Sequence, residues 1–166
     1  MTDPISNIPS PEVERQVQEI RDRQLAGRAA LGATVYPLVF AMIAYGTGLN
    51  EQNHGLVIGA LATLFVLAFT RIAVCLLFNI VHDFSPSLWR SCFIFSAANL
   101  GLAWGIISAY FIMTAPWAPP TLLFLFAGSG LAGGMIATIA IDRTAYRVYL
   151  LGILVPPGLA SLLVEQ

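Results

Sequence analysis

Five long apolar segments limit what this chain can fold into. They cover residues 32–49, 56–78, 89–113, 120–141 and 147–164. Each approaches or exceeds the about 20 residues that a helix needs to cross the hydrocarbon core of a bilayer. A lone strand in lipid would leave its backbone unpaired, so helix is the expected local structure. Only 10% of the residues are charged, whereas soluble domains carry about 25%. We therefore predict an all-α polytopic membrane protein with five transmembrane helices.

The segment before these apolar runs is polar. Ser10 is a suitable N-cap and Pro11 suits the first position of a helix, so a short amphipathic helix is expected to begin here. Its narrow apolar stripe consists of Val13, Val17 and Ile20. Such a stripe fits a cytosolic helix at the membrane surface, or alternatively a short dimer seam. The chain thus divides into a cytosolic tail with an amphipathic helix at 1–28 and a transmembrane bundle at 29–166.

The basic residues predict the topology, and all eight are arginines. They lie before the first apolar segment, between the second and third, and between the fourth and fifth, with Arg71 assigned to the inner end of the second. Because cytoplasmic loops are the ones enriched in basic residues, we expect a cytoplasmic N-terminus and Gln166 on the opposite side. Aromatic residues near segment ends are expected to form interfacial belts; they are Trp89, Trp117, Tyr146 and Tyr149.

The stretch GSGLAGG at 128–134 raises the question of a phosphate-binding loop. The chain has no lysine, so it lacks the P-loop motif G-x-x-x-x-G-K-[ST]. Gly128, Gly130 and Gly133 match G-x-G-x-x-G, but that fingerprint needs a preceding strand and these residues lie within an apolar segment. Small residues let helices approach closely in lipid. We therefore interpret Gly130, Gly134 and Thr138 as a helix-packing face.

The sequence offers no residue arrangement typical of an active site or a metal site. Ser129 is flanked by glycines, but His54 and His82 are predicted at opposite membrane faces and away from it. His82 and Asp83 are adjacent in a predicted cytosolic loop, where we expect them to be solvated. The two cysteines show no metal-ligand spacing, and a net charge of −1 argues against nucleic-acid binding. We expect no catalytic residue, cofactor, metal ion or nucleic-acid partner.

Two polar residues inside apolar segments are candidates for an intramembrane role. Arg71 either extends to the headgroups, as long basic side chains do near helix ends, or is a buried cation that pairs within the bundle or binds an anionic headgroup. Asn99 is expected to hydrogen-bond a neighbouring helix rather than to bind a ligand.

Two stretches carry a resemblance to a known class of membrane region. They are WRSCFIFSAANLGLAWG at 89–105 and FAGSGLAGGMIATIAIDRTAYRVYLLGILVPPGL at 126–159. They resemble the N-terminal multi-span region of bacterial sensor histidine kinases and diguanylate cyclases, with a Trp-Arg start, a later Trp-Gly, a small-residue helix and a last helix with prolines. The resemblance implies a signal-input role in a bacterial inner membrane and no catalytic residue. Unlike those regions, the chain ends at LLVEQ without an output domain, which suggests a fragment of a longer receptor or a stand-alone protein.

The leading functional hypothesis is therefore a non-enzymatic membrane sensory or signal-input module that contacts the lipid bilayer. We expect it to form a homodimer or to assemble with another membrane protein. The alternative is a small transporter or an accessory subunit of a membrane complex. A transporter should show a polar path at mid-membrane, for which only Asn99 and Arg71 are candidates.

Overall fold

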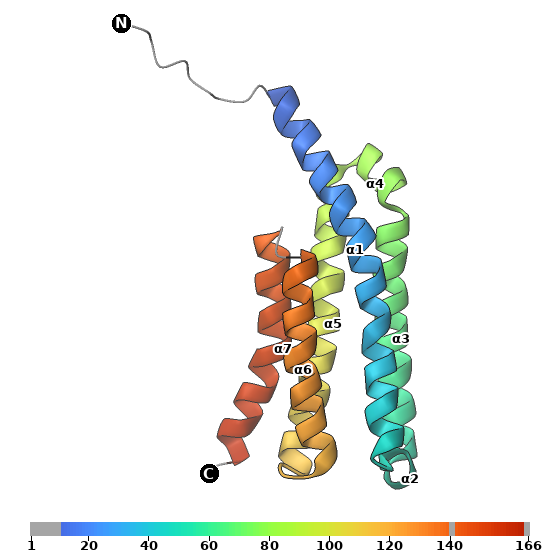
Figure 1. Cartoon of the computed structure of the whole chain (residues 1–166), viewed down its shortest axis with the longest axis vertical. Coiled ribbons are helices and arrows are strands. Elements are labelled where there is room, and N and C mark those ends of the chain that lie inside the picture. The colour runs from blue at the N-terminus through green and yellow to red at the C-terminus, as the bar shows by residue number, and fades with distance from the viewer. Residues whose placement is uncertain (1–10, 140–141, 165–166) are drawn as a thin grey trace, which may run out of the picture.

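The computed structural model describes residues 11–139 and 142–164, without the side chains of residues 11, 15 and 136–138, and over these ranges the chain forms seven helices and no strand (Figure 1). The helices are α1 (Pro11–Gly46), α2 (Leu49–Gln52), α3 (His54–Leu76), α4 (Phe78–Phe84), α5 (Pro86–Thr114), α6 (Pro119–Ile139) and α7 (Arg143–Val164). The predicted all-α class is confirmed.

Four helices in the described part of the chain are long and apolar enough to cross a membrane, namely α1, α3, α5 and α7. The predicted segments at 32–49, 56–78, 89–113 and 147–164 fall largely on them. The predicted segment at 120–141 extends past the described residues, and α6, which covers most of it, is not among the four. A multi-pass membrane protein is thus supported, whereas the count of five spans stays a prediction.

The N-terminal helix differs from the prediction. α1 begins at Pro11, as expected, but runs without a break past the predicted boundary at 28/29 to Gly46, so the amphipathic helix and the first span are one helix of 36 residues. The junction at 24–34, QLAGRAALGAT, contains no proline and is rich in alanine and leucine, which favour helix. α1 is therefore about 54 Å long, against about 30 Å for the hydrocarbon core. Ser10, the predicted N-cap, lies outside the described residues.

Two of the predicted loops contain short helices. The connection after α1 turns at Gly48, whose φ of 71° is a left-handed conformation that favours glycine, and leads into α2. The loop around HDFSPS contains α4 and then Ser85, whose hydroxyl accepts a hydrogen bond from the Leu88 amide at 3.4 Å. With Pro86 at the first position, this cap explains why α5 begins there.

The connections alternate between the two ends of the bundle (Figure 1). α4, the end of α6 and the start of α7 lie at the end where α1 begins, whereas α2 and the end of α7 lie at the opposite end. The former end is called the arginine-bearing end, because the polar half of α1 contains Arg21, Arg23 and Arg28, the start of α5 contains Arg90, and the start of α7 contains Arg143 and Arg147. One end thus collects these charges, as the arginine pattern requires.

The closest helix contact joins α5 to α7. A Cβ added to Gly101 would lie 2.7 Å from the Tyr149 carbonyl oxygen, and one added to Gly152 would lie 2.8 Å from the Leu102 amide nitrogen. A Cβ on Gly105 would overlap the Gly152 carbonyl oxygen. These three glycines, here the α5–α7 seam, therefore allow two backbones to touch.

The glycine face predicted on α6 has different surroundings. A Cβ added to Gly130 or Gly134 meets no atom within 4 Å among the described residues. Both glycines line a groove of about 370 Å³ between α1 and α6, the α1–α6 groove, with Gly32 and Tyr36 on the α1 side. The Cβ positions of Gly130 and Gly134 thus face the groove, and the predicted helix-packing role stays a prediction. The side chain of Thr138 lies outside the described residues.

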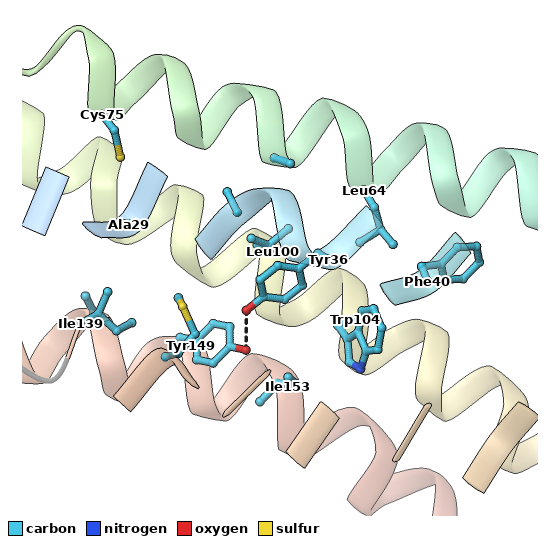
Figure 2. Close-up of a cluster of buried hydrophobic side chains, with 14 of the residues drawn as sticks. Ala29, Tyr36, Phe40, Leu64, Cys75, Leu100, Trp104, Ile139, Tyr149 and Ile153 are labelled. Atoms are coloured by element: carbon cyan, nitrogen blue, oxygen red, sulfur yellow. Dashed lines mark hydrogen bonds between the residues drawn. The ribbon is translucent and has the colours of Figure 1, made fainter. Parts of the chain in front are cut away.

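Large aromatic residues fill the interior. Tyr36 from α1, Trp104 from α5 and Tyr149 from α7 converge there (Figure 2), and the Phe111 and Phe124 rings stack with centroids 4.8 Å apart. The predicted aromatic belt is therefore wrong in part, because Trp89 and Tyr149 are buried core residues. Trp117, by contrast, is 85% exposed.

Candidate functional site

The candidate site is built around Arg71 on α3. The buried residues of this helix follow a spacing of three or four, Leu64, Ala68, Arg71 and Cys75, so Arg71 occupies the face that packs inward. Its side chain is 1% exposed and directed at α5. The side chain of Arg71 therefore does not extend toward lipid headgroups, which was one of its two predicted roles, because helices enclose its guanidinium.

The contacts of the guanidinium are few for a buried cation. Nη1 donates to the Ser96 hydroxyl at 3.1 Å and to the Phe93 carbonyl oxygen at 3.4 Å, and Cζ lies 4.5 Å from the centroid of the Phe93 ring. Nη2 has no hydrogen-bond partner in the described structure, and no carboxylate of a described residue lies within 4.0 Å of the guanidinium. An enclosed charge of this kind is costly in a low-dielectric interior.

Other polar groups surround this cation. The Tyr36 hydroxyl donates to the Tyr149 hydroxyl at 2.6 Å and so links α1 to α7 (Figure 2). Both tyrosines and Cys75 interact electrostatically with Arg71. Arg71, Ser96, Tyr36, Tyr149 and Cys75 are here called the Arg71 cluster. It contains residues of α1, α3, α5 and α7, with hydrogen bonds between α3 and α5 and between α1 and α7.

Asn99, the second predicted intramembrane residue, does not join this cluster. Its amide donates to the Phe95 carbonyl oxygen of the same helix at 2.9 Å, and the residue lines a shallow groove with Thr63 of α3. The expected hydrogen bond to a neighbouring helix is not among its contacts. The structure therefore separates the two predicted residues.

A second polar group lies at the arginine-bearing end. His82 Nε2 on α4 is 3.5 Å from Asp22 Oδ2 on α1, and Arg90 Nη2 on α5 is 2.8 Å from Asp142 Oδ2. The other oxygen of Asp142 accepts from the amides of Thr144 and Ala145 and thereby caps α7. These contacts join α1 to α4 and α5 to the start of α7.

The electrostatics of this group depend on the burial of Asp22. This residue precedes the apolar stretch of α1, and burial raises the pKa of its carboxyl above the ordinary value, while the charges of His82 and Arg90 act in the opposite direction. The His82 ring also packs against the Phe78 ring at an interplanar angle of 32°, with ring centroids 4.7 Å apart. His82 is thus packed between helices, and its predicted solvation is wrong, whereas Asp83 is exposed.

The contacts of this second group were not predicted from the sequence, where His82 was expected to be solvated and Asp22 and Asp142 had no predicted role. Asp22 belongs to a segment interpreted as a surface helix, and the remaining three belong to predicted loops. One signal was available: Asp142 is followed by a helix start, which is the position where a carboxylate caps free amides. The pairing between distant loops has no local signal.

Comparison with family models, with curated proteins and with solved structures found no match to this chain. Its function is therefore inferred from the geometry described above.

Proposed function

We propose that this chain is a non-enzymatic signal-input module of a bacterial inner membrane, in which α1 carries the state of the bundle to the arginine-bearing end. The observation that supports this most is the unbroken helix from Pro11 to Gly46. Its apolar half holds Tyr36 in the Arg71 cluster, and its polar half holds Asp22 against His82. A movement of α7 that shifts Tyr149 can therefore reach the polar half of α1 through continuous helix.

The polar contacts also favour a non-enzymatic role. Among the described acids, Asp22 is engaged by His82, Asp142 caps a helix, and Glu19 pairs with Arg23 at 3.6 Å. The contacts of Asp142 and Glu19 stabilise a helix, and that of Asp22 joins two helices. In the proposed module the N-terminus is cytoplasmic and the chain acts as a homodimer or beside another membrane protein.

The test follows hydrogen–deuterium exchange of the full chain in nanodiscs of two lipid chain lengths. Bilayer thickness changes the tilt of spanning helices. We expect the amides of residues 12–28 to exchange at different rates in the two bilayers. An Asp22→Asn variant weakens the contact with His82, so the difference in exchange rate between the two bilayers should change. The control is Asp83→Asn, which alters the exposed residue next to His82 in sequence and should behave like the parent. Identical exchange of residues 12–28 in both bilayers would overturn the proposal.

A further inference from the structure

A groove of about 390 Å³ lies between α1 and the end of α3, at the arginine-bearing end. Its lining includes Arg23, Ala26, Gly27, Cys75, Leu76 and Asn79, and it is here called the α1–α3 groove. It lies just before the apolar stretch of α1 and at the last turn of α3. This is the level at which a spanning helix meets the headgroups.

The rim of this groove carries donors. The Arg23 side chain is 67% exposed, and its described ion pair with Glu19 is long, at 3.6 Å. Asn79 is also exposed and offers an amide group. Gly27 leaves the α1 wall open, because a Cβ added there meets no atom within 4 Å. An anion can therefore approach two donors without displacing a helix.

The inner side of the groove lies next to the Arg71 cluster. Cys75 lines the groove and lies one helical turn from Arg71 on the same buried face of α3. Arg71 is the buried cation that lacks a carboxylate partner among the described residues. A negative charge in the groove would be attracted across the low-dielectric layer formed by Cys75, which makes an anion the favoured occupant.

We propose that the α1–α3 groove binds the phosphate of an anionic membrane lipid, with Arg23 and Asn79 as direct contacts and Arg71 as the buried counter-charge. A free phosphate has the same chemistry, but the surface beside the groove favours a lipid. Leu76, which lines the groove, is 75% exposed and Ile80, next to Asn79 in sequence, is 71% exposed, so acyl chains find apolar surface beside the phosphate. This binding does not depend on the signalling role proposed above.

The experiment titrates the full chain, in a neutral detergent, with phosphatidylglycerol or phosphatidylcholine of the same acyl chains, and counts bound lipid by native mass spectrometry. Phosphatidylglycerol should bind about tenfold more tightly, because Arg23 repels the choline cation of phosphatidylcholine, which offsets the attraction of its phosphate; a tenfold ratio corresponds to about 1.4 kcal/mol. Arg23→Gln should remove most of that preference. Gly27→Leu, which fills the groove without altering charge, should do the same.

The matched control is Arg28→Gln, which removes the same charge from an exposed position of α1 outside the groove. It should leave the preference intact. Arg71→Gln should weaken binding, and if that variant does not fold, Arg23→Gln and Gly27→Leu decide. Equal binding of both lipids, or equal losses in Arg23→Gln and Arg28→Gln, would overturn the proposal. Displacement of phosphatidylglycerol by equimolar inorganic phosphate would also overturn it, because the site would then take free anions.

Discussion

Two glycine pairs in this protein have the same spacing and opposite surroundings. Gly101 and Gly105 on α5 lie so close to α7 that an added Cβ would overlap or crowd its backbone. Gly130 on α6 faces open space, and with Gly134 it lines the α1–α6 groove. A G-x-x-x-G pattern therefore identifies a face on which helices can approach, but a partner helix decides whether that face is filled.

The difference between the two faces has a physical cause. The α5–α7 seam has glycines on both helices, because Gly152 of α7 faces Gly101 and Gly105 of α5. The α1–α6 groove pairs the α6 glycines with Val35, Tyr36 and Val39 as well as Gly32. Bulky side chains on one wall keep the two backbones apart. The comparison predicts that equal substitutions on the two faces have unequal effects.

The largest expected effect is that of Gly105→Leu. The new side chain would meet the Gly152 carbonyl and the Pro156 ring, and because a carbonyl on a packed helix has little freedom to move, the cost should reach the upper part of about 1–3 kcal/mol. Thermal unfolding in detergent should show it as a clear loss of stability. The control is Gly130→Leu, which extends into the groove and should keep near-parental stability. Equal losses would mean that the two faces are equally filled.

Asp142→Ala should come next, with a loss of about 1–2 kcal/mol. It removes the cap on α7 and the ion pair with Arg90, both of which hold the end of the α5–α7 pair. Asp142→Asn keeps a capping side chain and should lose less. Chemical denaturation of both variants measures the difference. If Asn is as damaging as Ala, the ion pair and not the cap is the main contribution.

A smaller loss is expected for Tyr149→Phe. The hydroxyl pair with Tyr36 is buried, and polar contacts between membrane helices average about 0.6 kcal/mol, with an upper limit near 1.7 kcal/mol. A double-mutant cycle with Tyr36→Phe isolates the pair. Additive losses in the double variant would show that the two hydroxyls do not interact in the membrane.

The smallest expected effect has the opposite sign. Gly130→Ala should stabilise the bundle by about 0.5 kcal/mol, since alanine restricts the unfolded chain and its methyl group meets no atom within 4 Å. The same change at position 105 should destabilise. A destabilising Gly130→Ala, measured at several protein concentrations, would indicate that a second chain occupies this face.

The sequence predicted helices well and predicted their partners poorly. Long apolar segments dictate helix because lipid offers the backbone no other partner, and α3, α5 and α7 follow from this. The continuity of α1 could have been predicted, because the junction at 24–34 contains no helix-breaking proline. Which of the two glycine pairs is covered by a neighbouring helix could not have been predicted, since that depends on the residues of the other helix.

The site shows the same division. The inward direction of Arg71 follows from its spacing with Leu64, Ala68 and Cys75, and this pattern was available in the sequence. The contact between His82 and Asp22 was not evident in the sequence, because tertiary packing alone brings α4 next to the polar half of α1. Local patterns thus identify the charged residue, whereas its neighbours depend on the arrangement of four helices.

The length of α1 has a mechanical consequence. About 24 Å of this helix extends beyond the thickness of a hydrocarbon core, and a helix is stiff over such a distance. A rotation of about 10° at the membrane surface would move the far end sideways by about 4 Å, given that projecting length. α1 is thus a lever: a small angular change in the bilayer becomes a displacement close to the width of a side chain. His82 on α4 lies 3.5 Å from Asp22, part-way along the projecting arm, so a displacement of the arm reaches α4 as well.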